Sequence, residues 1–109
     1  MRLFGSTFFF LVLVSVVPAL ADDTTALKSL LDDSWEFGLQ ESPTFATHVG
    51  DHRFNDQLSH ETIADQQRRL AKYRECLARL KGIDRAKLTK TDGINYDIFQ
   101  RILNNDIAE

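Results

Sequence analysis

Two long helical patterns are separated by residues 42–58, which read SPTFATHVGDHRFNDQL. Ser42 can accept a hydrogen bond from a free backbone N–H group at a helix start, and Pro43 fits the first helical position because it has no N–H to donate. Gly50 suits the left-handed conformation that commonly ends a helix. The stretch therefore predicts a two-turn helix followed by a polar connector over residues 51–57.

The segment before this stretch predicts a helix over residues 22–39. Thr24 or Thr25 can cap its start. Gly38 lies in its apolar stripe, where the missing side chain would let another helix approach closely. Apolar or small residues at helical spacing define the stripe, with Trp35 beside it: Leu27, Leu30, Leu31, Ser34 and Gly38.

The clearest helical pattern follows the stretch, over residues 59–81. Ser59 is the predicted N-cap, and Leu58 can contact Ile63 as a hydrophobic staple. Gly82 is the predicted stop. Cys76, the single cysteine of the chain, lies next to the apolar face of this helix. We expect it to act as a small buried hydrophobe rather than a reactive thiol.

A last helical pattern follows Thr89, which with Asp92 resembles a capping box that has a shorter acid. Its apolar stripe is wide, so we expect burial on more than one side. The stripe comprises Ile94, Tyr96, Ile98, Phe99, Ile102, Leu103 and Ile107. Together the patterns predict an all-α fold of about four helices.

Residues 1–21 have the features of a cleaved signal peptide. Arg2 supplies the positive start, residues 8–17 are apolar, and residues 19–21 form an A-x-A cleavage site. The alternative is an uncleaved membrane anchor over residues 3–21, which is nearly long enough to span a bilayer. We expect cleavage and a secreted or periplasmic protein, whose contact with a membrane is limited to the signal peptide.

Charge is distributed unevenly along the chain. Residues 22–65 carry two basic and ten acidic side chains, whereas residues 68–90 carry nine basic and two acidic ones. A basic block can mark nucleic-acid binding. An exported chain rarely meets nucleic acid, so we expect the acidic and basic helices to pack as neighbours instead.

Residues 42–58 also carry a family resemblance. The order Ser-Pro, Ala-Thr, Gly-Asp-His-Arg-Phe-Asn-Asp and Leu resembles the N-terminal signature of the bacterial family called domain of unknown function 885. The resemblance extends from about Leu27 to the end of the chain. Later residues that agree with it are Leu80, Ile83, Asp84, Leu88, Asn95, Tyr96 and Asp97.

That family resembles all-helical zinc metallopeptidases. The resemblance implies a peptide substrate, a zinc ion and a glutamate base acting through metal-bound water. The zinc-binding His-Glu-x-x-His of the family lies far downstream of the part present here, and His60-Glu61 is followed by Thr62, Ile63 and Ala64. We therefore expect neither a catalytic residue nor a bound metal within this chain.

The histidines of the connector are the other metal candidates. His48 and His52 have the i,i+4 spacing of two ligands on one helix face, and Asp51 could add a third. Gly50 interrupts that face, so we favour a hydrogen-bonded connector over a metal site.

Arg53 is the one candidate substrate-binding residue. Its planar guanidinium could bind a substrate carboxylate if the connector lies near an active site. The alternative, which we favour, is that Arg53 bonds Asp51, Asp56 or a helix end and holds the connector in place.

These observations predict a function only in outline. Residues 22–109 are expected to be the N-terminal helical segment of a larger domain, because the last pattern reaches Glu109 without a stop signal. Its expected partners are the C-terminal part of that domain and a peptide substrate, and no nucleic acid. The alternative is a small exported helical binding protein that pairs through its apolar stripes.

Overall fold

A computed structural model describes residues 22–109, so the predicted signal peptide lies outside the described residues. The described part forms four α-helices: α1 (Asp23–Glu41), α2 (Pro43–His48), α3 (Ile63–Lys81) and α4 (Lys90–Ala108). Two short 3₁₀ helices, η1 (His52–Phe54) and η2 (Arg85–Lys87), lie in the connections. These residues form no strand, and the all-α prediction is confirmed.

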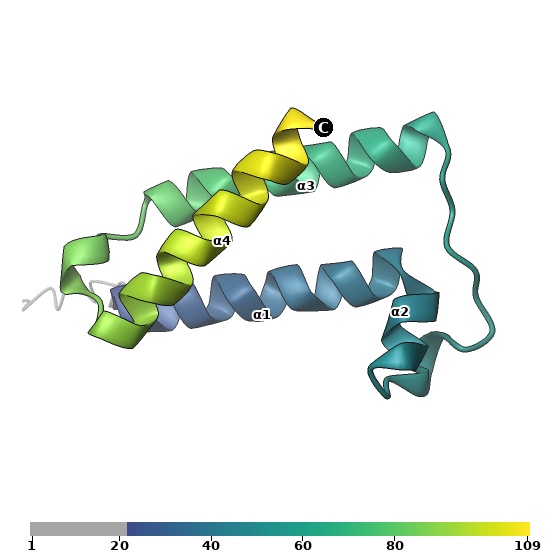
Figure 1. Cartoon of the computed structure of the whole chain (residues 1–109), viewed down its shortest axis with the longest axis horizontal. Helices are drawn as coiled ribbons and strands as arrows, with labels where there is room; N and C mark the ends of the chain where they lie inside the picture. Colours follow the sequence, from purple (N-terminus) through teal and green to yellow (C-terminus); the bar gives the residue numbers. More distant parts are fainter. Residues whose placement is uncertain (1–21) are drawn as a thin grey trace, which may run out of the picture.

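The long helices pack around a shared apolar core, and Figure 1 shows how they are arranged. α1 and α3 lie roughly alongside each other in opposite directions, and α4 crosses between them and packs most extensively on α3. α2 sits at the far end of α1, and an extended loop returns from it to the start of α3. No helix in the described part is both long and apolar enough to cross a membrane.

The core is built from one face of each long helix. Cys76 belongs to it, as predicted, and its burial raises the pKa of the thiol, which keeps the sulfur protonated. The buried cluster comprises Leu27, Leu30, Cys76, Leu80, Ile83, Tyr96, Phe99 and Leu103.

The cap of α1 differs from the prediction. Asp22, rather than Thr24 or Thr25, is the N-cap, and its Oδ1 accepts a hydrogen bond from the backbone N–H of Thr25 at 2.7 Å. Asp and Thr are both good caps, so the sequence did not distinguish between adjacent candidates.

The start of α3 also differs from the prediction. Thr62, not Ser59, is the N-cap: its hydroxyl accepts from the backbone N–H of Asp65 at 3.2 Å, and the Asp65 carboxylate accepts from the backbone N–H of Thr62 at 3.0 Å. Only Thr62 has an acid three residues later, which completes this reciprocal box. The predicted staple is wrong, since Leu58 and Ile63 are both exposed.

The break between α1 and α2 follows the prediction in its main features. Pro43 is the first residue of α2, and Gly50 has a φ of 92°, the left-handed conformation expected after the helix. The predicted capping bond from the Ser42 side chain is absent, and Ser42 also ends α1, where its backbone N–H donates to the Gly38 carbonyl. Gly38 itself is exposed, so the predicted close approach of another helix is wrong among the described residues.

α4 begins as predicted but is covered on one side only. The Thr89 hydroxyl accepts from the backbone N–H of Asp92 at 3.2 Å and caps the helix. Ile94, Ile98 and Ile102 are 49%, 53% and 48% exposed. Burial on more than one side is therefore not found among the residues described.

Candidate functional site

Arg53 lies where η1 follows the short helix α2. Asp51 caps η1 by accepting the Arg53 backbone N–H at 3.1 Å, which directs the two side chains toward each other. The guanidinium donates to both carboxylate oxygens of Glu36 at 2.9 Å and to Asp51 Oδ2 at 2.6 Å. Arg53 thereby ties the connector to α1.

These contacts shift the ionisation of all three groups. The hydrogen bonds from Arg53 lower the pKa of Asp51 and of Glu36, while Asp51 first and Glu36 second raise the pKa of Arg53. The cluster is therefore fully charged at neutral pH. Holding the connector is the role that this geometry favours, because Glu36 and Asp51 accept from most of the N–H groups of the guanidinium. Substrate binding by Arg53 stays a prediction.

The histidines of the connector do not converge. His48 is the last residue of α2 and His52 the first residue of η1, where its Nδ1 lies 3.2 Å from the side-chain nitrogen of Asn55. Residues 22–109 contain no group of three or more His, Cys, Asp or Glu side chains placed to hold a metal. That this chain binds no zinc stays a prediction for metal analysis of the purified protein.

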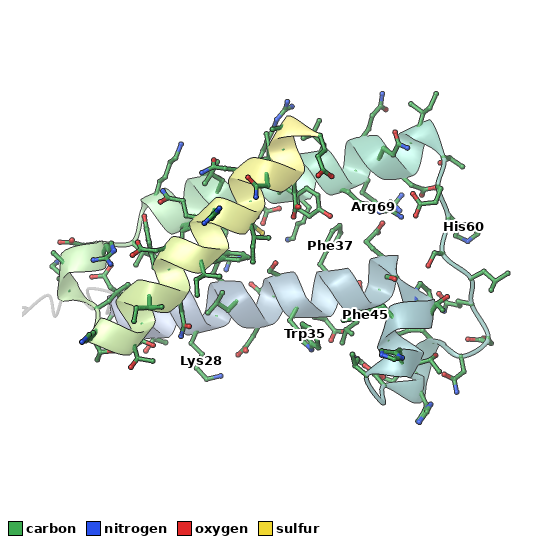
Figure 2. All side chains as sticks on the ribbon, in the orientation of Figure 1. Lys28, Trp35, Phe37, Phe45, His60 and Arg69 are labelled. Carbon is green, nitrogen blue, oxygen red and sulfur yellow. The ribbon has the colours of Figure 1, made fainter. Side chains whose placement is uncertain are left out.

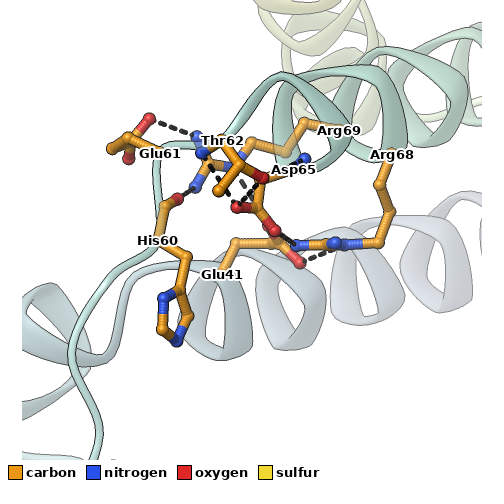
Figure 3. A network of polar contacts seen from close by, with 7 residues as sticks. All are labelled: Glu41, His60, Glu61, Thr62, Asp65, Arg68 and Arg69. Atoms are coloured by element: carbon orange, nitrogen blue, oxygen red, sulfur yellow. Dashed lines mark hydrogen bonds and ion pairs between the residues drawn. The ribbon is translucent and has the colours of Figure 1, made fainter.

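A second cluster joins the end of α1 to the start of α3 (Figure 3). Arg68 donates to both oxygens of Glu41 at 2.9 Å, and Arg69 donates to Glu41 Oε2 at 3.0 Å. Arg69 also bonds Glu61 at 2.9 Å and the backbone carbonyl of His60 at 2.7 Å. Arg69 therefore connects α1, α3 and the end of the long loop.

This second cluster contains a more buried arginine than the first. The side chains of Arg69 and Glu41 are only 18% and 15% exposed. Hydrogen bonds from Arg68 first, and then from Arg69, lower the pKa of Glu41. With both oxygens of Glu41 engaged, it is an ionised structural group and not an available acid or base.

The sequence did not single out this cluster, although it carried a signal for it. Glu41 lies in the acidic segment, and Arg68 and Arg69 open the basic one. Arg79 of α3 likewise donates to Asp33 of α1 at 2.9 Å. The prediction that the acidic and basic helices pack as neighbours is confirmed.

An aromatic groove lies on the other side of α1. Trp35 and Phe45 project on the side away from α3, whereas Phe37 points toward α3 (Figure 2). The groove has a volume of about 490 Å³, and Phe99 of α4 contributes to its lining. Helical spacing did not predict it, because Phe45 belongs to α2 and meets Trp35 only after the chain turns at residue 42.

Comparison with known proteins did not identify a relative of this chain. No family model, curated protein or solved structure matches the chain. The resemblance to the domain of unknown function 885 family therefore depends on the motif residues alone.

Proposed function

We propose that this chain is the N-terminal helical segment of an exported, peptidase-like protein and that its role is to pack against further helices of the same domain. The observation that carries the proposal is the second apolar face of α4. Ile94, Ile98 and Ile102 recur at four-residue spacing and are about half exposed.

An apolar row of this kind is costly when left in water. Exposed apolar area forfeits about 25 cal/mol per Å² relative to burial, and contiguous apolar patches commonly mark contact surfaces. The motif residues supply the rest of the argument, since they resemble the front part of a zinc peptidase. In that arrangement this chain contributes a wall of the domain, while zinc and the catalytic glutamate belong to the downstream part.

The test has two parts. The gene is read beyond codon 109, and a frame that continues to a His-Glu-x-x-His motif is expected. The downstream polypeptide is then expressed separately and mixed with this chain. We expect a complex in which the amides of α4 gain protection from hydrogen exchange. An Ile94→Thr, Ile98→Thr, Ile102→Thr variant should lose the complex and keep its helicity by circular dichroism.

A different result would overturn the proposal. If the frame stops after codon 109, or if the downstream polypeptide leaves α4 unprotected, the packing role fails. The second candidate, a small exported helical binding protein, is favoured by the exposed Trp35–Phe45 pair. It predicts a folded, soluble chain that needs no downstream part.

Export is tested separately. The proposed secreted or periplasmic location requires removal of residues 1–21, so the exported protein should begin at Asp22 when its intact mass is measured. Recovery of the full-length mass from the membrane fraction would favour an anchor instead.

A further inference from the structure

The groove beside α1 has aromatic walls and an apolar base. Its more buried lining residues are Leu31, Leu39 and Phe99, and the more exposed ones are Trp35 and Phe45, at 55% and 45%. Gly38 lies at the same groove, and apart from its chain neighbours and the backbone of its own helix, no described atom comes within 4 Å of the Cβ position that it lacks. The groove is therefore open to solvent and accessible to a ligand.

The two exposed rings stand almost at right angles. The Trp35 and Phe45 ring centroids are 6.0 Å apart with an interplanar angle of 77°. Aromatic faces carry negative electrostatic potential, and perpendicular rings that surround an alkylated ammonium group are a recurring way to bind it. The two rings contact each other edge to face, and the open corner beside that contact favours a weakly hydrated cation.

The charge near the groove also favours a cation. Asp32 lines it, and none of its described lining residues is basic. The Asp32 carboxylate accepts a hydrogen bond from Lys28 at 2.9 Å, but these side chains are 68% and 76% exposed, respectively. Such a surface pair contributes little, so a ligand cation can take the place of the Lys28 ammonium group.

We propose that this groove binds soluble alkylated ammonium compounds, with the cation in the corner beside the Trp35–Phe45 contact and near the Asp32 carboxylate. Methyl groups on nitrogen lower the cost of removing the cation from water, and they match the apolar lining. The volume of about 490 Å³ leaves space for an attached chain to lie against Leu31 and Phe99. The proposal is independent of the packing role of α4.

Trp35 makes the test direct, because it is the single tryptophan of the chain. Its fluorescence is followed in the full chain during titration with choline and with 3,3-dimethylbutan-1-ol, the uncharged analogue of the same shape. We expect a saturable change with choline and roughly tenfold weaker binding of the alcohol, the size of a cation–π and carboxylate contribution.

Variants distinguish binding in the groove from attraction to surface charge in general. Asp32→Asn should weaken choline binding roughly fivefold, and Phe45→Leu should weaken it at least as much while keeping the fluorophore. Asp33→Asn is the matched control, since Asp33 pairs with Arg79 and does not line the groove. Circular dichroism checks that each variant keeps the helicity of the parent.

Four outcomes would overturn the proposal. One is the absence of a saturable change up to about 20 mM choline, where a millimolar site would be nearly filled. Another is equal binding of the uncharged alcohol, or an equal loss in Asp33→Asn. The last is a response to phosphatidylcholine vesicles without a response to free choline, which would assign the surface to a membrane instead.

Discussion

The two faces of α4 have similar composition and opposite environments. Tyr96, Phe99 and Leu103 are buried against α1 and α3, whereas Ile94, Ile98 and Ile102 are about half exposed on the other side. Hydrophobicity alone therefore does not decide burial in this helix. What decides it is the set of neighbours, and the described residues provide neighbours for one face only.

The largest expected effect is on the covered face. Leu103→Ala should lower the free energy of unfolding by about 2–5 kcal/mol, because Leu103 is 1% exposed and its removal leaves a cavity between packed helices. Urea unfolding followed by circular dichroism measures it. Alanine has the highest helix propensity, so a loss of stability would come from lost packing and not from a weaker helix. A loss below about 1 kcal/mol would mean that this face is not tightly packed.

The sequence predicted the covered side of the molecule better than its uncovered side. Helical spacing gave the three long helices and placed Leu27, Leu30 and Leu103 on apolar stripes, because burial of a stripe imposes a period of 3.6 residues. It could not show that half of the α4 stripe stays exposed. That property depends on which other helices are present.

The candidate sites were harder to predict for the same reason. Asp51 and Arg53 are two residues apart, so their contact could be anticipated, but Glu36 joins them only through the fold. Arg69 and Glu41 are 28 residues apart, and their opposite charges were the only feature of the sequence that indicated a contact. Long-range pairs of this kind depend on how α1 and α3 are aligned, which local patterns do not specify.

The next largest effect concerns polar contacts that support the covered side. Glu41→Gln should lower the free energy of unfolding by about 1–3 kcal/mol, because it removes the charge that satisfies Arg68 and Arg69 at a partly buried position. Asp33→Asn, at an exposed ion pair with Arg79, should cost less. Equal losses in the two variants would show that burial does not strengthen the Glu41 cluster.

A smaller effect should appear as the pH falls. The pKa of Glu41 is lowered in the folded state from its ordinary value of 4.5, so its stabilisation is present above that value and is lost as the pH falls through the lowered pKa. The difference in unfolding free energy between the parent chain and Glu41→Gln should therefore shrink below pH 4.5. Urea unfolding at a series of pH values measures it, and a constant difference would contradict the assignment.

The smallest effect on stability is expected on the uncovered face, and it is the sharpest test of the comparison. Ile98→Thr should change the unfolding free energy of this chain by no more than about 0.5 kcal/mol, because the side chain is 53% exposed and threonine has a similar helix propensity. In the complex with the proposed downstream part, the same change should weaken association, since Ile98 is the middle residue of the row. A large loss of stability in the chain alone would instead mean that Ile98 is already buried, through self-association or another arrangement of α4. Sedimentation velocity at two concentrations separates those cases. The contrast between Leu103→Ala and Ile98→Thr therefore decides whether the two faces of α4 have separate roles, one inside this chain and one toward a partner.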